Sequence, residues 1–227
     1  MIKVLRNWQE VGEATLALQR AGLPLHETPQ KNFDHFVLRE ALAGLRKDAT
    51  IVDLGCGRAN TLGFLHALRF TNLRGVDLVV ERYARLRQAM LMLRERTTRR
   101  PFGLFRGDLT STPLAPGSCD VAVSISTIEH GVDVERFLKE VARLLKPGGI
   151  LFVTTDYWED KIDTAGVHEF GLPWQIFSRD QIVALVQVAA RVGLKPVANE
   201  DVPACAERPV FWHDCYYTFI AVLFRKS

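Results

Sequence analysis

Short apolar runs alternate with longer amphipathic stretches along most of the chain. Strand-like runs occupy residues 50–54, 73–77, 102–106, 119–126 and 150–155, and the later part of the chain adds 195–199 and 215–223. Helical patterns lie between them, at about 61–68, 80–96, 133–145 and 178–192. Short β-branched runs are typical of buried parallel strands, whereas helices need longer periodic segments. The alternation therefore predicts an α/β domain.

The first 47 residues carry a different pattern. Their helical periodicity is interrupted at Gly22-Leu23-Pro24, and the ten residues from Leu25 to Asp34 are rich in polar side chains. We predict an N-terminal helical cap at 1–47, followed by the main domain at 48–227. The polar segment is interpreted either as a cap over a site or as a solvent-exposed linker, since loops serve both purposes.

The segment 50–60 combines a strand, two glycines and the start of a helix. Gly55 and Gly57 permit a tight turn and a close approach of a ligand to the backbone, and the helix N-terminus carries partial positive charge. The dinucleotide fingerprint has a third glycine at the sixth position, where this chain has Asn60. Asp53, two residues before Gly55, would repel a pyrophosphate but suits a ligand with an ammonium or sulfonium group.

This segment resembles the glycine-rich loop of class I S-adenosylmethionine-dependent methyltransferases. Two later segments resemble the same family, namely Ser126-Thr127-Ile128-Glu129-His130 after the fourth strand and Leu145-Lys146-Pro147-Gly148-Gly149 before the fifth. The resemblance covers about residues 50–157 in unbroken order and is to bacterial small-molecule enzymes of methyltransferase type 11. It implies a Rossmann-like fold, with helices on both faces of a seven-stranded, mostly parallel sheet in the order 3-2-1-4-5-7-6.

The resemblance also implies S-adenosyl-L-methionine as cofactor, S-adenosyl-L-homocysteine as product, and no metal ion. Asp77 ends the second strand, where a carboxylate accepts hydrogen bonds from ribose hydroxyls. In similar methyltransferases an aspartate at the position of Asp108 accepts from the adenine amino group, and the next backbone N–H contacts the ring. The predicted cofactor-binding residues are Asp53, Gly55, Cys56, Gly57, Asp77, Leu78, Asp108, Leu109 and Ser126.

His130 is the candidate catalytic residue. It lies at the carboxyl end of a strand, where α/β proteins collect their functional groups. Imidazole titrates near neutral pH, so this side chain could take a proton from an acceptor hydroxyl or amine. A packed histidine beside the cofactor, without a role in proton transfer, is the alternative.

Acceptor-binding residues are predicted in three segments that mix aromatic and charged side chains. The N-terminal polar segment contributes His26 and Asp34, and residues 201–214 contribute Trp212. Residues 156–177 contribute Asp156, Trp158, His168 and Trp174. Apolar walls with a few polar groups are typical of small-molecule sites. Surface loops that bury their own aromatic side chains are the alternative.

Composition and charge restrict the partners. The formal net charge of +3 is too small to require a nucleic-acid or membrane partner, and 48% hydrophobic content is ordinary for a globular protein. The four cysteines share no CxxC spacing, so neither a zinc site nor a disulfide framework is indicated. No apolar run approaches membrane-spanning length. We expect a cytoplasmic monomer or homodimer that binds no membrane.

One segment raises the question of a nucleic-acid partner. The helix expected at 80–96 carries Arg82, Arg85, Arg87, Arg94 and Arg96, and Arg99 and Arg100 follow it. We interpret it as an outer helix exposed to solvent, because no aromatic platform lies between the arginines. Its apolar face is expected to consist of Tyr83, Leu86, Met90, Leu91 and Leu93. RNA binding is the alternative.

The resemblance implies methyl transfer from S-adenosylmethionine to an O, N or C nucleophile. A small-molecule acceptor, such as a sugar or a secondary metabolite, is the expected substrate class. Ser126-Thr127-Ile128-Glu129 replaces the Asn/Asp-Pro-Pro-aromatic tetrad of enzymes that methylate amino groups of DNA or glutamine, so a nucleic-acid acceptor is not expected. The alternatives are a macromolecular acceptor, RNA or protein, and a non-catalytic module that binds S-adenosylmethionine.

Overall fold

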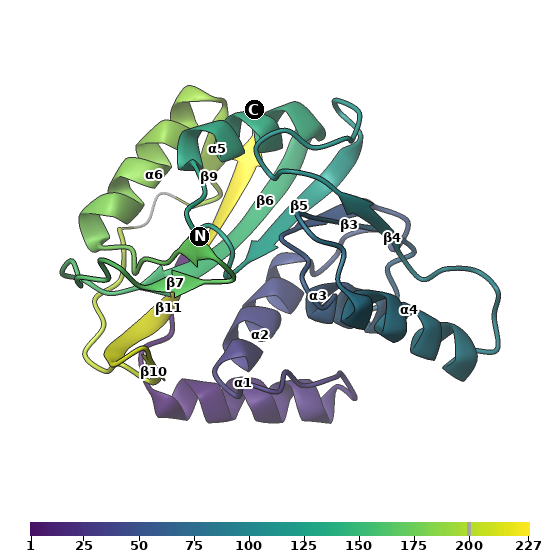
Figure 1. Cartoon of the computed structure of the whole chain (residues 1–227), viewed down its shortest axis with the longest axis horizontal. Coiled ribbons are helices and arrows are strands. Elements are labelled where there is room, and N and C mark those ends of the chain that lie inside the picture. The colour runs from purple at the N-terminus through teal and green to yellow at the C-terminus, as the bar shows by residue number, and fades with distance from the viewer. Residues whose placement is uncertain (199–200) are drawn as a thin grey trace.

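A twisted, mostly parallel sheet forms the centre of the molecule in a computed structural model that describes residues 1–198 and 201–227 (Figure 1). The strand order among these residues is β1-β11-β6-β5-β2-β3-β4, and β9 and β10 also pair with β11. The strands are β1 (Ile2–Val4), β2 (Thr50–Leu54), β3 (Asn72–Asp77), β4 (Gly103–Arg106), β5 (Cys119–Ile125), β6 (Leu145–Tyr157), β9 (Leu194–Pro196), β10 (Val210–Trp212) and β11 (Cys215–Lys226). A separate hairpin is formed by β7 (His168–Glu169) and β8 (Leu172–Pro173).

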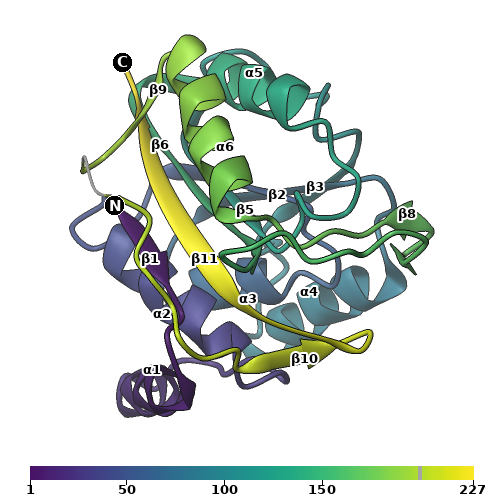
Figure 2. The same ribbon diagram turned by 90° about the vertical axis from the view of Figure 1, so that its left-hand side faces the viewer.

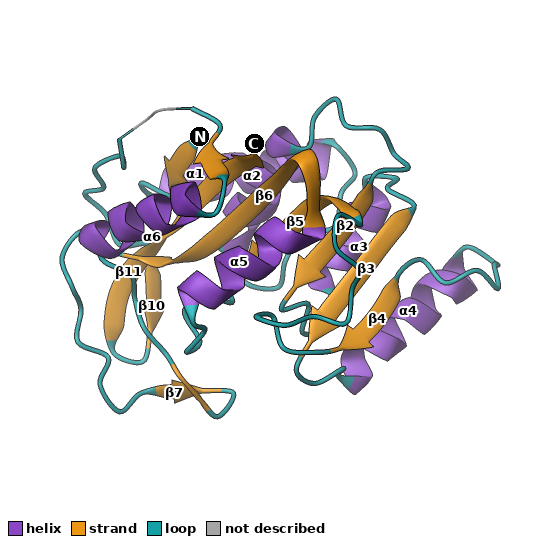
Figure 3. Ribbon diagram, turned by 90° about the horizontal axis from the view of Figure 1, so that it is seen from above, coloured by secondary structure: helices purple, strands orange, loops and turns teal. Residues whose placement is uncertain are grey.

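Helices cover both faces of this sheet (Figures 1 and 2). On one face lie α5 (Val134–Leu144) and α6 (Arg179–Arg191), and on the other lie α1 (Trp8–Arg20), α2 (Lys31–Ala41), α3 (Asn60–Ala67) and α4 (Arg82–Arg94). Seen from above, α4 lies at one end of the molecule and α6 at the other (Figure 3). The architecture is the predicted three-layer α/β arrangement.

The predicted strand order is confirmed in β4-β3-β2-β5-β6-β11-β9, where β11 alone runs in the opposite direction, since β9 pairs antiparallel with β11 and so has the direction of β6. The predicted number of strands is wrong, because β1 and β10 add two to the expected seven. Both are three-residue strands that pair with β11, which is long enough to hold partners along several parts of its length. The strand predicted at 195–199 is β9, and residue 199 lies outside the described residues.

The expectation that the first 47 residues are helical is wrong at their start. Ile2 and Val4 of β1 pair with Val222 and Ile220 and are buried, while Lys3 between them turns outward to an ion pair with Glu40. Alternation of two buried residues around a polar one is the period of a strand, but three residues are too few for this signal to be read. The central sheet thus includes residues on both sides of residue 47. The division into two parts at this residue stays a prediction.

Candidate active site

The glycine loop turns sharply after β2. Gly55 has φ +87°, and a Cβ added to it would lie 2.3 Å from Thr127 Cγ2, so no side chain fits here. The backbone N–H groups of Gly55 and Cys56 donate to Val76 O, at 2.9 and 3.2 Å, which ties the loop to β3. Gly57 has φ +41° and open space where a Cβ would stand. The loop is therefore fixed by its neighbours but leaves its backbone accessible.

Two acidic side chains flank this loop. Asp77 accepts the backbone N–H groups of Gly57, at 2.9 Å, and Val79, at 3.1 Å, through its two carboxylate oxygens. Each oxygen keeps a further acceptor site, which a ribose hydroxyl could use. Asp53 is fully buried, and its Oδ2 has no hydrogen-bond partner. Burial, together with the nearby Asp77, raises the pKa of Asp53 to about 8.

A cavity of about 760 Å³ opens between the glycine loop, the end of β3, the loop after β4 and the residues that follow β5. Its size lies within the range of small-molecule sites. Among the predicted cofactor-binding residues, seven line it directly, namely Gly55, Gly57, Asp77, Leu78, Asp108, Leu109 and Ser126. His130 is also part of the wall, whereas Asp53 lies behind the glycine loop and does not line the cavity. The cysteine side chain of the predicted set points elsewhere, since Cys56 is buried against the position of Gly75.

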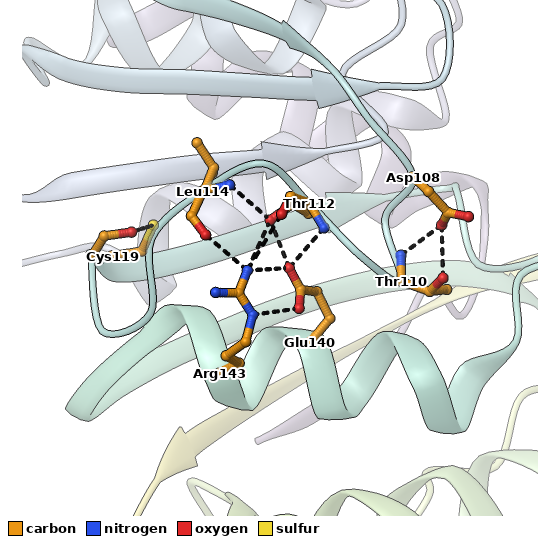
Figure 4. Close-up of polar contacts among 8 residues, drawn as sticks. Asp108, Thr110, Thr112, Leu114, Cys119, Glu140 and Arg143 are labelled. Carbon is orange, nitrogen blue, oxygen red and sulfur yellow. Dashed lines mark hydrogen bonds and ion pairs between the residues drawn. The ribbon is translucent and has the colours of Figure 1, made fainter.

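Asp108 is held by Thr110, whose backbone N–H and hydroxyl donate to Asp108 Oδ1 at 2.7 and 2.8 Å (Figure 4). These two hydrogen bonds lower the pKa of Asp108, so its carboxylate is ionised and its Oδ2 remains available to accept a donor. An adenine amino group is such a donor. The arrangement suits the predicted role of Asp108 in binding the cofactor.

The loop that carries Asp108 is anchored to α5 by a network around Glu140 (Figure 4). Glu140 is buried and accepts from Thr112 N at 2.8 Å, from the Thr112 hydroxyl at 2.6 Å and from the Arg143 guanidinium at 2.6 Å. Arg143 also donates to Leu114 O at 2.8 Å. Since every donor reaches a fixed acceptor, the network holds the loop against the helix.

His130 lies in the wall of the cavity, as the sequence predicts for a catalytic residue. Its ring contacts Phe170 edge-on, with 5.3 Å between ring centroids, and its Nδ1 is buried without a hydrogen-bond partner. Burial lowers the pKa of His130 to about 4, so the imidazole is neutral at pH 7. A neutral imidazole with an unused nitrogen is chemically able to accept a proton, and the assignment of this role stays a prediction.

A buried polar cluster lies next to Ser126. Lys31 at the start of α2 donates to Ser126 Oγ, forms an ion pair with Asp34 at 3.7 Å, and places its Nζ 3.7 Å from the centroid of the Phe219 ring. Glu129 and Asp156 are the other carboxylates of the cluster. Thr155 Oγ1 donates to Glu129 at 3.0 Å, and Trp174 Nε1 donates to Asp156 at 2.8 Å. We call Lys31, Asp34, Glu129 and Asp156 the acidic cluster.

The charges of the acidic cluster are out of balance, with three buried carboxylates and one ammonium group. Burial raises the pKa of Asp34 to about 7, and it also raises the pKa values of Glu129 and Asp156. Both oxygens of Asp34 and one of Glu129 have no hydrogen-bond partner. Within residues 1–198 and 201–227, no group of His, Cys, Asp or Glu is placed to hold a metal ion. The unused acceptors therefore suit hydroxyl or amine donors.

The β7–β8 hairpin is joined to the β10–β11 hairpin through Glu169. Glu169 accepts Trp212 Nε1 at 2.8 Å and contacts His213 Nε2 at 2.5 Å. Phe170, next to Glu169, lines the cofactor cavity. Trp212 is thus joined by a hydrogen bond to the hairpin whose Phe170 lines the cavity.

The structure separates the predicted acceptor residues into groups. Asp34, Asp156 and Trp174 come together in or beside the acidic cluster. His26 instead lines a different cavity and contacts Asn60 at 3.1 Å. Trp158 is buried under the Arg208 guanidinium, 4.0 Å from its ring centroid, and the exposed His168 bonds to Gly166 O. Their roles stay predictions.

Lys31, Glu129 and Phe170 are site residues that sequence reasoning missed. Lys31 stands inside the polar segment before α2, and Glu129 directly precedes His130, so both lay within segments already singled out. No local pattern shows that these segments meet, because their contact depends on how α2 packs against β6 and β11. Phe170 has φ +55°, an uncommon conformation that a sequence does not reveal.

Comparison with known proteins shows similarity between this chain and methyltransferases. The methyltransferase domain family matches residues 52–153. A ubiquinone biosynthesis O-methyltransferase from Ralstonia nicotianae is 30% identical over 135 residues, which are 58% of this chain and 52% of that protein. A tRNA (carboxymethyluridine(34)-5-O)-methyltransferase from Macaca fascicularis is 34% identical over 113 residues, which are 48% of this chain and 15% of that protein. The chain spans about half or less of these curated relatives.

Solved structures share the fold over nearly the whole chain. A geranyl diphosphate C-methyltransferase from Streptomyces coelicolor A3(2), solved with Mg2+, geranyl diphosphate and S-adenosyl-L-homocysteine, has a TM-score of 0.66 at 16% identity, covering 97% of this chain and 85% of that chain. The 4+2 cyclase SpnF has a TM-score of 0.62 at 18% identity, covering 96% and 93%. At these identities the likeness concerns the fold alone. No helix in the described part of the chain is long and apolar enough to cross a membrane.

Proposed function

Because the chain belongs to the class I S-adenosylmethionine-dependent methyltransferases, we propose that it transfers a methyl group from S-adenosyl-L-methionine to a nucleophile of a small-molecule acceptor. The observation that carries this proposal is the cavity in which Gly55, Asp77 and Asp108 meet Ser126 and His130. The predicted cofactor, S-adenosyl-L-methionine, is the cofactor of this family. The acceptor and the acceptor atom are part of the proposal.

The residues of the cavity fit this cofactor. Asp53 has an unpaired carboxylate oxygen behind the glycine loop, Gly57 has room for a ligand against its backbone, and Asp108 has a free oxygen. We assign Asp77 to the ribose hydroxyls, Asp108 and Leu109 to the adenine ring, and the glycine loop to the amino-acid end. The bound cofactor supplies an electrophilic methyl group on a positively charged sulfur.

The task of the protein is then mainly orientation, since an aligned acceptor reacts as if at very high local concentration. For a hydroxyl or amine acceptor, the neutral His130 is proposed to accept the proton at its imidazole nitrogen. Phe170 contacts this ring edge-on. The acidic cluster, joined to the cavity wall through the Lys31–Ser126 hydrogen bond, is proposed to orient polar groups of the acceptor.

The unpaired oxygens of Asp34 and Glu129 favour an acceptor that carries several hydroxyl or amino donors, such as a sugar. The relative named for ubiquinone biosynthesis also supports a small-molecule acceptor. Against a tRNA acceptor stands the short match to the tRNA enzyme, which covers less than half of this chain.

The test is incubation of the purified protein with methyl-labelled S-adenosylmethionine and a fractionated extract of the source cells. Label in the low-mass fraction supports a small-molecule acceptor, and label that precipitates with macromolecules contradicts it. Binding of S-adenosyl-L-homocysteine without any labelled product would favour the non-catalytic module. An Asp77→Ala variant run in parallel identifies background labelling, because it is expected to bind the cofactor poorly.

A further inference from the structure

The outer surface of α4 is the part of the molecule that neither the cofactor cavity nor the acidic cluster uses. Ala84 is the buried residue of this 13-residue helix. Four apolar side chains are exposed on it, namely Tyr83 (61%), Leu86 (55%), Met90 (62%) and Leu93 (80%). The apolar face expected from the sequence therefore exists, but most of it points to solvent instead of the core.

These four residues are spaced by three, four and three positions, so they form one continuous stripe along the helix. Arginines border the stripe on both sides. Arg82 and Arg85 precede Tyr83 and Leu86 by one position, which places them on one flank, while Arg87 and Arg94 follow Leu86 and Leu93 on the other. An exposed apolar stripe bordered by basic residues offers an anionic membrane surface both apolar contact and neutralising charge.

The positive charge of this region is largely unneutralised. Seven arginines and one glutamate lie between residues 82 and 100, so the segment is more positive than the whole chain, whose net charge is +3. In the described residues, the side chains of Arg82, Arg85, Arg94, Arg96, Arg99 and Arg100 make no ion pair and no side-chain hydrogen bond. This excess charge attracts an anionic partner, and each basic residue adds to its binding.

A groove on the flank of the stripe has the same mixed character. It encloses about 450 Å³, and its wall combines Arg58, Arg87 and Arg94 with Tyr83, Leu86, Met90 and Leu91. Glu27 is the acidic residue of this wall. A lipid phosphate would meet the guanidinium groups, while the first carbons of its chains would meet the apolar side chains.

We propose that α4 is a docking surface for an anionic phospholipid membrane. RNA fits the surface less well, because the residues between the arginines are aliphatic and Tyr83 is the aromatic side chain among them, 5.0 Å from the Arg58 guanidinium. A second copy docking through the same face would bring two positive surfaces together. The expectation of no membrane partner was based on the small net charge and the lack of a spanning run, and a basic helix lying on the surface needs neither.

The position of α4 leaves it free to act in this way. It lies at one end of the molecule in Figures 1 and 3, and α3 lies between it and α2, which carries Lys31 and Asp34 of the acidic cluster. The residues of the stripe line neither the cofactor cavity nor the acidic cluster. Removal of the stripe should therefore leave cofactor binding unchanged.

Sedimentation of the protein with sucrose-loaded vesicles tests the proposal. We expect the protein to pellet with vesicles of equal phosphatidylcholine and phosphatidylglycerol but not with phosphatidylcholine alone, and binding to fall as salt is raised. Two variants remove the surface, Leu86→Ser with Met90→Ser and Arg85→Gln with Arg94→Gln. Each is expected to lower vesicle binding by about tenfold or more, with unchanged affinity for S-adenosyl-L-homocysteine.

A matched control lies on α6, where Val183 and Arg191 are an exposed apolar and an exposed basic residue. Val183→Ser with Arg191→Gln should bind vesicles like the wild type. Failure to pellet with anionic vesicles, or full binding by both α4 variants, overturns the proposal. So does salt-sensitive RNA binding without vesicle binding, or a dimer in solution that the Leu86/Met90 variant abolishes. These results are independent of methyl transfer, so the two proposals fail separately.

Discussion

Lys31 on α2 donates a hydrogen bond to Ser126 at the end of β5, so the N-terminal segment reaches the wall of the cofactor cavity. The same ammonium group is the cation of the acidic cluster. The segment before the first central strand thus contributes to the site directly, and the pH dependence of its carboxylates can be measured.

Asp34 should make the protein less stable as pH rises. In the unfolded chain this carboxyl loses its proton near pH 4, whereas in the folded chain burial keeps it protonated to about pH 7. Between these values the unfolded state binds fewer protons, so the free energy of unfolding falls with rising pH, by up to about 1.4 kcal/mol per unit. Asp34→Asn is expected to lose this slope between pH 4 and 7 in urea unfolding. Asp201→Asn, at an exposed site, should keep it, and an equal slope in both variants would contradict the assignment.

The two loop glycines should respond differently to alanine. At Gly55 the added Cβ meets Thr127 and φ is positive, so Gly55→Ala is expected to cost about 2 kcal/mol or more in the free energy of unfolding. At Gly57 the space is open, and Gly57→Ala should cost about 1 kcal/mol from its positive φ. Both variants should lose affinity for S-adenosyl-L-homocysteine by calorimetry. Equal stability of the two variants would show that the Thr127 contact is relieved by movement.

Asp77 should contribute directly to cofactor affinity. Its oxygens hold Gly57 and Val79 in place, and ribose hydroxyls would add charge-assisted hydrogen bonds. Asp77→Ala is expected to weaken S-adenosyl-L-homocysteine binding by about tenfold to a hundredfold. Asp160→Ala, which removes an exposed carboxylate, is the control. Retained affinity in Asp77→Ala would mean that the ribose is bound elsewhere.

Phe170 should control the protonation of His130. Burial lowers the pKa of His130 to about 4, and the ring of Phe170 covers one side of it. Phe170→Ala is expected to raise this pKa toward the ordinary value near 6.5, measured by an NMR titration of the imidazole. Phe211→Ala removes an exposed aromatic ring that stacks on Tyr216, and should leave the titration unchanged. If the imidazole of His130 titrates at the wild-type pKa in both variants, residues other than Phe170 cause the burial of His130.

Glu140 should stabilise the loop that carries Asp108. Removal of its carboxylate leaves Thr112 and Arg143 without their acceptor, so Glu140→Ala is expected to lower the free energy of unfolding by about 2 to 3 kcal/mol. Glu135→Ala breaks the exposed pair with Lys139 on the same helix and should cost less than about 1 kcal/mol. A similar loss in the two variants would show that burial adds little at Glu140.

Local sequence predicts residues that the structure brings together around one cavity, because they lie at the ends of consecutive strands. Asp77 can be assigned from its distance to the glycine loop, since parallel strands end at one edge of the sheet, and Asp108 from the resemblance to class I methyltransferases. The order of the seven predicted strands was implied by the same resemblance. Local sequence misses β1 and β10, whose three residues are too short for any periodicity.

The acidic cluster, which we propose orients the acceptor, was not predictable in the same way. Lys31, Glu129 and Asp156 come from three distant segments, and their proximity follows from the packing of α2 beside β6 and β11. For α4 the sequence predicts which residues share a face, but amphipathic spacing does not say whether that face meets the core or something outside the molecule.

The pairing of β1 with β11 has a consequence for how the protein is made. Val4 of β1 is aligned with Ile220, so more than 200 residues must leave the ribosome before this pair can form. Contacts so distant along the chain form late. The helices α1 and α2 lie between β1 and β2 along the chain, and α2 carries Lys31 and Asp34. During synthesis the cofactor cavity can therefore form first, while the acidic cluster is completed only after β11 has been added.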